Sequence, residues 1–276
     1  TTNITVSNSA PVVDSLILNA TSSGNLTTDN LTAYVTTSDA EGDDVKVIYN
    51  WLKDSSSITL LNMPFEKIND TTTNNAHDYS GFGNDGTVTS ATWNETGGYD
   101  GKGAYDFDGA SGEIKLDSYS SQLSPKDNDF SLTAWFKTNS SSQQTIYSAR
   151  DSDTSDWLAL DIGVASAGQM RWICDDGSDP LTTITKDNVN DRAWHFVTIT
   201  RDASENLFKM YYDGIYVNED TNTDSSIDID TETSIGETVW SDTRNFNGTI
   251  DEVQIFNRSL SADQIYALYQ NRTDEI

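Results

Sequence analysis

Short runs in which apolar and polar residues alternate dominate this chain. Leu31–Val35 and Val45–Trp51 alternate with a period of two, as half-buried β-strands do. Val12–Leu18 and Ile58–Leu61 are short runs rich in β-branched and aliphatic residues, and clusters of Ser, Gly, Asn and Asp separate the four segments. Four short strands within residues 11–66 predict a small β-sandwich of the immunoglobulin type.

The pattern changes after residue 66. Residues 67–76 are polar and are expected to form a linker, and from His77 to Phe256 glycines and aromatic residues punctuate closely spaced strands. Within Trp194–Thr200 both sets of alternating positions are largely apolar, which is typical of a central strand of a sandwich. We therefore expect a second, larger β-domain at residues 77–276.

One short helix is expected near the end of the chain. Ser261 can cap it, and Gln264, three residues later, completes a capping box. Ile265, Leu268 and Tyr269 then form a single apolar stripe. The overall prediction is an all-β protein in which this helix docks on the second sandwich.

Charge and composition exclude several function classes. The chain has 44 acidic against 16 basic residues and a net charge of −28, which repels nucleic-acid phosphates and anionic lipids. The chain contains no run of about 18 apolar residues, so no membrane-spanning helix is predicted. Cys174 is the single cysteine, so no intrachain disulfide can form, and its strand-like surroundings predict a buried free thiol.

Asn-x-Ser/Thr sequons are dense, and they favour a glycosylated extracellular or cell-surface protein over an accident of a Ser/Thr-rich composition. They begin at Asn3, Asn19, Asn25, Asn30, Asn69, Asn94, Asn139, Asn247, Asn257 and Asn271.

Three segments of the first region resemble immunoglobulin-like or cadherin-like modules of archaeal surface proteins. They are Ala10–Val13, Thr36–Asp43 and Tyr49–Trp51. In such modules an Asp-rich strand end can hold Ca²⁺ between domains. Here the acids of that strand end would be Asp39, Glu41, Asp43 and Asp44, with a solvated turn as the alternative reading.

A longer series of motifs resembles the laminin-G-like (concanavalin-like) jelly roll, and it covers residues 77–276. Each motif is weak alone, but all of them occur in the family's order: His77–Thr87, Ala91–Trp93, Gly103–Gly109, Phe130–Phe136, Trp194–Asp202, Tyr211–Gly214 and Phe246–Leu260. The resemblance implies a concanavalin-like jelly-roll sandwich.

The same resemblance suggests where Ca²⁺ could bind. Asp108 and Asp251 lie in the two most regular motifs, and related sandwiches often hold Ca²⁺, which takes six to eight oxygen ligands. Pentraxins share this fold and bind ligands through Ca²⁺ on two loops, to which Asp156 on one side and Glu237 with Asp242 on the other are similar in order. Turn capping by these carboxylates is the structural alternative.

Trp157 and Trp240 stand beside those acidic loops. An exposed indole offers a rigid apolar face on which a sugar ring can stack, whereas packing in the core or at its rim is the alternative. These two tryptophans are the predicted ligand-binding residues.

Catalysis is not expected. Glucanases of the concanavalin-like fold carry alternating carboxylates on one strand. Asp228–Glu232 alternates in this way, but its first acid is Asp where the glucanase motif has Glu. His77 and His195 are far apart in sequence and belong to no recognisable catalytic set.

Two functions follow from these observations. The first is an extracellular carbohydrate-binding or adhesion module whose partners are glycans or glycosylated surface proteins. The second is a structural subunit of a filament, sheath or S-layer-like coat. In the second case the N-terminal extension, residues 1–10, would add as a strand to the open sheet edge of a neighbouring subunit.

Overall fold

The computed structural model describes residues 9–20, 22–24, 29, 31–66, 75–152, 156–164, 166–175, 182–221, 227–240 and 244–270. The chain divides into two compact units. The first comprises Thr1–Tyr49 with Gln270–Ile276, and the second is Asn50–Tyr269.

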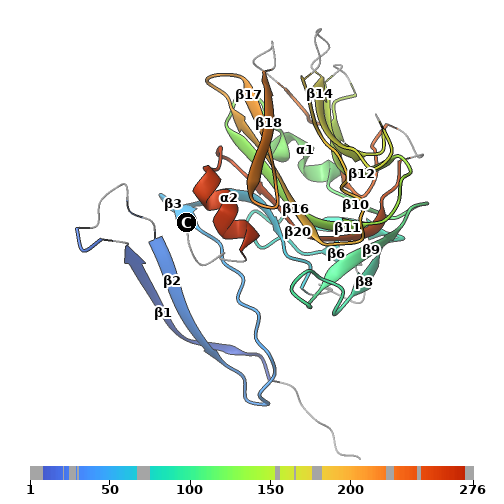
Figure 1. Cartoon of the computed structure of the whole chain (residues 1–276). Coiled ribbons are helices and arrows are strands. Elements are labelled where there is room, and N and C mark those ends of the chain that lie inside the picture. The colour runs from blue at the N-terminus through green and yellow to red at the C-terminus, as the bar shows by residue number, and fades with distance from the viewer. Residues whose placement is uncertain are drawn as a thin grey trace, which may run out of the picture. The chain divides into compact units, whose positions relative to one another are not determined.

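The described part of the first unit contains one two-stranded antiparallel ribbon, drawn in blue in Figure 1. Strand β1 (Val12–Ala20) pairs with β2 (Leu31–Ser38). Leu16 lies opposite Val35, and directly opposed residues share a face of the ribbon. One face is therefore apolar apart from Thr37, and its other members are Val13, Leu16, Leu18, Ala20, Leu31, Ala33 and Val35.

The immunoglobulin-like sandwich expected at residues 11–66 is not shown. Two of its strands exist as predicted, but Val45–Trp51, predicted as a third, is not part of any strand. Alternation of apolar and polar residues indicates an extended segment whose two faces differ in polarity. It does not show that another strand lies alongside to complete a hydrogen-bond ladder. Of the N-terminal extension expected at residues 1–10, residues 1–8 lie outside the described residues.

The fourth predicted strand belongs to the second unit. β5 (Thr59–Met63), which overlaps the run Ile58–Leu61, pairs with β20 (Asn247–Phe256). The compact units divide between Tyr49 and Asn50, whereas the sequence predicted a boundary at residue 66. The end of the expected linker is also ordered into a strand, since Asn75 and Ala76 form β6.

The second unit consists of two antiparallel sheets, seen as two layers in Figure 1. Sheet 1 has the order β15-β14-β13-β12-β19-β10-β7-β6, and sheet 2 has the order β18-β17-β16-β11-β20-β9-β8, with β5 also paired to β20. A short hairpin of β3 (Leu52–Lys53) and β4 (Ser56–Ser57) precedes β5.

The remaining strands of sheet 1 are β6 (Asn75–Ala76), β7 (Gly86–Thr89), β10 (Glu113–Lys115), β12 (Gln144–Arg150), β13 (Trp157–Ile162), β14 (Met170–Asp175), β15 (Thr182–Lys186) and β19 (Glu232–Ile235). Those of sheet 2 are β8 (Thr92–Asn94), β9 (Ala104–Asp108), β11 (Phe130–Thr138), β16 (His195–Asp202), β17 (Leu207–Tyr212) and β18 (Ile215–Thr221). A 3-10 turn (Asp117–Tyr119) and helix α1 (Ser120–Leu123) follow β10.

The core fills the space between the sheets. Leu132 and Phe136 of β11 meet Ile146 of β12 and Leu160 of β13 there, and each is at most 1% exposed. Cys174 is also buried in this core, as a free thiol, as predicted. Burial of one face from each sheet is the arrangement expected of a sandwich.

Helix α2 (Ala262–Tyr269) covers the opposite face of sheet 2 (Figure 1). Ile265 packs there with Trp135 and Phe196 in a second apolar cluster, which explains why Trp194–Thr200 is apolar on both faces. The predicted capping box is present. The Ser261 amide donates to Gln264 Oε1 at 3.0 Å, and the Gln264 amide donates to Ser261 Oγ at 3.3 Å.

The structure is thus mostly β-sheet with short helices, and it confirms the all-β fold with a concanavalin-like jelly roll and a short C-terminal helix. Neither helix in the described residues has the length and apolar character that crossing a bilayer requires.

Candidate ligand-binding face

The candidate site lies on the face of sheet 1 that points away from the core, called here the outer face. Along β13, Leu158, Leu160 and Ile162 enter the core, so Trp157 and Asp161 lie on the outer face. Asp161 is fully buried there, and its charge is compensated because its Oδ2 accepts from Arg171 at 2.8 Å and from Arg244 at 3.5 Å.

A loop of residues 236–240 is fastened to this face. Gly236 begins it with a left-handed backbone (φ +87°) and donates its amide to the carbonyl of Ile146 at 2.9 Å. Ser148 Oγ of β12 donates to the Glu237 carbonyl at 2.7 Å and accepts from the Val239 amide at 3.1 Å. These bonds hold the backbone next to Trp240 against the sheet.

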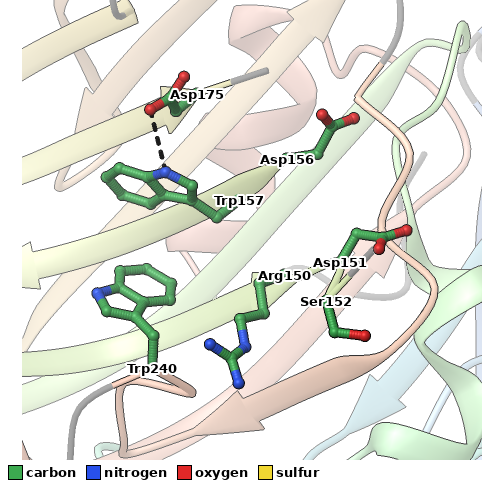
Figure 2. Close-up of a pocket in the computed structure, with 7 residues that line it drawn as sticks. All are labelled: Arg150, Asp151, Ser152, Asp156, Trp157, Asp175 and Trp240. Carbon is green, nitrogen blue, oxygen red and sulfur yellow. Dashed lines mark hydrogen bonds between the residues drawn. The ribbon is translucent and has the colours of Figure 1, made fainter. Parts of the chain in front are cut away.

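A pocket of about 570 Å³, called here the tryptophan pocket, opens beside this loop. Its rings, Trp157 and Trp240, have centroids 4.6 Å apart and planes inclined by 60°. Figure 2 shows the two indoles on one side and the acidic loop residues on the other, with Arg150 between them. The lining residues are Arg150, Asp151, Ser152, Asp156, Trp157, Asp175 and Trp240.

Hydrogen bonds hold this lining in place. The Trp157 indole donates from Nε1 to Asp175 Oδ2 at 3.1 Å, which joins β13 to β14. Asp156 Oδ2 accepts from the amide of Asp228 at 2.8 Å, and the Asp156 carbonyl accepts from the Asp151 amide at 2.9 Å. The pocket lining therefore comes from three parts of the sequence that are far apart: residues 150–157, Asp175 and Trp240.

The charge of the pocket is mainly negative. Arg150, its one basic residue, forms an ion pair with Glu232 of the neighbouring strand β19. A hydrogen bond to Asp151 of the lining is the main cause that raises the pKa of Asp230. The carboxylates that line the pocket can accept hydrogen bonds from hydroxyl or amine groups of a ligand. Their negative charge disfavours the binding of an anionic ligand.

The structure separates the acids that the pentraxin resemblance had grouped. Asp156 lines the tryptophan pocket, whereas Glu237 lines a second pocket on the same outer face. Asp242 lies outside the described residues. No cluster of three metal-binding groups within the described part of the chain includes Asp156 or Glu237, so their role as a joint Ca²⁺ site stays a prediction.

Asp251 is fully buried. Its Oδ1 accepts from the Glu252 amide at 2.8 Å, and its Oδ2 accepts from the Tyr99 amide at 3.1 Å. Burial, together with the charge of Glu252, raises the pKa of Asp251 well above its ordinary value. The bond to Tyr99 links β20 to the loop before β9. Asp251 therefore has a structural role that does not depend on a bound cation.

Three further carboxylates meet in this region. One oxygen from each of Glu66, Asp100 and Glu252 lies within 4.8 Å of the others, which makes this the one such cluster among the described residues. Sequence reasoning missed all three. Glu252 lies next to Asp251, which the sequence did single out as a possible metal ligand. Glu66 falls in the segment 11–66, which the sequence predicted to be a separate domain.

Asp108 has a local structural role. Its Oδ1 accepts from the amides of Ala110 at 2.8 Å and Ser111 at 3.0 Å. These two backbone hydrogen bonds lower its pKa and close the turn after β9. A role for Asp108 as a metal ligand stays a prediction.

The sequons differ in accessibility. Those described as exposed are Asn19, Asn139, Asn247 and Asn257, whereas Asn94 is half-buried and donates its amide to Asp106 Oδ2 at 2.9 Å. Asn3, Asn25, Asn30, Asn69 and Asn271 lie outside the described residues.

Known proteins share this fold. The receptor-binding domains of botulinum neurotoxin C/D mosaic serotype and of serotype G superpose with TM-scores of 0.58 and 0.57, each at 19% identity. The serotype D domain in complex with N-acetylneuraminic acid gives 0.58 at 19% identity. All three matches cover 78% of this chain and 51% of the neurotoxin domain, so the chain spans about half of their length.

Among curated proteins no match was found. A family profile, described as the Concanavalin A-like lectin/glucanases superfamily, matches residues 108–266, which is more than half of the chain. This segment contains β10 to β20, both tryptophans of the pocket and the start of α2. The chain belongs to the Concanavalin A-like lectin/glucanases superfamily.

Proposed function

We propose that the protein is a non-catalytic carbohydrate-binding module of the cell exterior, and that the sugar binds in the tryptophan pocket. The observation that carries this proposal is the pairing of Trp157 with Trp240 in a pocket that also presents several carboxylates. An indole face packs against the C–H face of a sugar ring, and carboxylates accept from its hydroxyl groups. The pocket offers both.

The charge of the lining narrows the class of sugar. Asp151, Asp156 and Asp175 face a single basic residue, Arg150, which is already paired with Glu232. A sialic or uronic acid would meet net repulsion there. We therefore expect a neutral or amine-bearing sugar.

The similarity to receptor-binding domains supports glycan binding in general. One of the matched structures contains N-acetylneuraminic acid. The chain spans about half of that domain, so this ligand is not carried over to the tryptophan pocket. The support lies in the shared sandwich, and the identity of the sugar depends on the residues of this chain.

A binding function fits the carboxylates better than hydrolysis does. Of the alternating acids Asp228, Asp230 and Glu232, only Glu232 lies on strand β19, and it is paired with Arg150. The carboxyls of Asp230 and Asp151 are hydrogen-bonded to each other, whereas glycosidases hold their two carboxyls about 5–9.5 Å apart across the bond they cleave.

The test is binding to an array of neutral, amine-bearing and acidic glycans, followed by calorimetry with the best ligand. Trp240→Ala should weaken binding by about tenfold or more, because aromatic anchors dominate such sites. Tyr216→Ala is the matched control, since it removes an aromatic side chain that is 48% exposed on sheet 2. Loss of binding in both variants, or in neither, would contradict the assignment.

Calcium binding is a separate proposal. Glu66, Asp100 and Glu252 converge at oxygen distances that a Ca²⁺ ion can bridge, and carbonyls or water would supply the remaining ligands. The cluster joins the segment after β5, the loop before β9, and β20. A cation there would stabilise the sandwich and is not expected to contact the sugar.

One observation favours the structural alternative. Leu16, Leu18 and Val13 of the ribbon are 55–65% exposed, and a two-stranded sheet is marginally stable without a covering layer. A subunit that assembles through this ribbon would bury its apolar face. Light scattering with a Leu16→Asp, Leu18→Asp variant tests it: assembly that persists unchanged in this variant would rule out the ribbon as the contact.

A further inference from the structure

A second pocket lies on the outer face of sheet 1, across the Arg150–Glu232 ion pair from the tryptophan pocket. Its volume is about 340 Å³, and its lining is Glu113, Lys115, Asp117, Glu232, Ser234, Glu237, Thr238 and Val239. Strands β10 and β19 form its floor, and the same loop that carries Trp240 forms one wall. We call it the Glu113 pocket.

Glu113 is the unusual residue of this pocket. Ile114 turns into the core, which places Glu113 and Lys115 on the outer face. Glu113 is only 8% exposed, its Oε1 lies 3.5 Å from Lys115 Nζ, and its Oε2 has no hydrogen-bond partner within the described part of the chain.

An unsatisfied carboxylate oxygen in a buried position is costly, because it has lost water without gaining a donor. Here that oxygen belongs to a residue that lines a pocket, so a ligand can supply the donor. The neighbouring carboxylates of Asp117, Glu232 and Glu237 add negative charge to the pocket. Lys115, whose side chain is half exposed, is the basic residue among the lining residues and offsets part of this charge. A positively charged donor suits this environment best.

The two pockets are close enough to serve one ligand. Arg150 lines the first, Glu232 lines the second, and they are directly opposed on adjacent strands. Neighbouring strands lie about 4.8 Å apart, which is similar to the length of one sugar ring. The loop from Glu237 to Trp240 contributes side chains to both pockets.

We propose that the outer face of sheet 1 binds an amine-bearing oligosaccharide in two subsites. One sugar ring stacks in the tryptophan pocket, and an ammonium group on a neighbouring sugar donates to Glu113 in the second pocket. The proposal rests on the sugar site assigned to Trp157 and Trp240, and adds a subsite that selects for amino sugars.

Calorimetry with the glucosamine tetramer, the N-acetylglucosamine tetramer and glucosamine itself tests it. We expect the glucosamine tetramer to bind most tightly, and Glu113→Gln to weaken it by about tenfold, the usual effect of one charged hydrogen bond. The affinity of the N-acetylated tetramer should change less than about twofold, because a neutral amide does not need the charge of Glu113.

Two further variants keep the result interpretable. Glu219→Gln changes the net charge equally but lies on β18 of sheet 2, so it should leave affinity unchanged. Lys115→Met removes a half-exposed cation beside Glu113 and should strengthen binding of the glucosamine tetramer about two- to threefold. This variant tests the pocket even if Glu113→Gln lowers stability.

The outcomes separate the two proposals. Suppose that Trp240→Ala weakens binding of the glucosamine tetramer, whereas Glu113→Gln and Lys115→Met leave its affinity unchanged. The second subsite is then wrong and the sugar site stands. If no sugar binds, or binding does not need Trp240, the sugar site itself is wrong and the second subsite fails with it.

Discussion

Gly236 lies directly against the ring of Phe107. A β-carbon at residue 236 would stand 2.2 Å from Phe107 Cε1, and the backbone there has φ +87°, so both space and conformation require glycine. Phe107 is a core residue of β9, and Gly236 starts the loop that carries Trp240. The packing of the core therefore constrains the start of the loop that carries Trp240, and with it the proposed sugar site.

We expect Gly236→Ala to destabilise the protein by about 1–3 kcal/mol, as overpacking and a left-handed alanine both cost energy. The loop should also shift, so sugar affinity should fall even at temperatures where the variant is fully folded. Denaturant unfolding and calorimetry measure the two effects. Gly101→Ala is the control, because it also has a positive φ but no atom within 4 Å of its β-carbon. Equal sugar affinity in Gly236→Ala and the wild type would argue against the coupling.

His195 should make stability depend on pH. Its Nδ1 lies 2.9 Å from Asp213 Oδ2 and its Nε2 lies 3.0 Å from Asp191 Oδ1. Burial works to lower the pKa of His195, but the hydrogen bonds and charges of the two aspartates outweigh it, so the pKa is raised above its ordinary value of 6.5.

A raised folded-state pKa means that the protonated ring stabilises the fold. This stabilisation is complete below the unfolded-state pKa of about 6.5 and is lost as the pH rises through the folded-state pKa. Melting midpoints measured across this range should fall with rising pH in the wild type and less in His195→Gln. Parallel curves for the two proteins would show that His195 contributes nothing.

Calcium should raise the melting midpoint. An ion that binds only the folded state adds about 2.7 kcal/mol when its concentration is a hundred times the Kd, which corresponds to several degrees for a domain of this size. Asp100→Asn should abolish the difference between chelator and millimolar Ca²⁺. Asp127→Asn, an exposed residue outside the cluster, should preserve it. Identical midpoints with and without Ca²⁺ in the wild type would remove the metal assignment at this cluster.

N-linked glycans should be found at Asn139 and not at Asn94. Asn139 is exposed after β11, whereas the Asn94 amide that a glycan would modify already donates to Asp106. Peptide mapping of native protein by mass spectrometry gives the occupancy of each sequon. A glycan at Asn94, or a bare Asn139 in a protein glycosylated elsewhere, would contradict this reasoning.

Much of the sandwich of the second unit could be predicted from the sequence because its signals are local. Alternation along Phe130–Phe136 and Trp194–Thr200 reports buried faces, and Ser261 with Gln264 reports a helix start. The position of β5 could not be predicted, because its partner β20 lies almost 200 residues away and strand alternation does not name a partner.

The same limit applies to the sites. Trp157 and Trp240 could be singled out because each stands beside acidic residues in the sequence. Their contact, and the convergence of Glu66 with Glu252, depend on strand register across both sheets. Glu113 gave no signal, because an acid on a short alternating strand is usually solvated, and its burial comes from strands and a loop contributed by distant segments.

The most direct test of the sugar site follows the indole N–H resonances of the seven tryptophans in a ¹⁵N-¹H spectrum during titration with the glucosamine tetramer. Trp157→Phe and Trp240→Phe assign the two signals of the pocket. We predict that these two move in proportion to binding, with Trp157 reporting on its bond to Asp175, while Trp135 and Trp172 stay in place. Saturable binding that leaves both pocket signals unmoved would contradict the account.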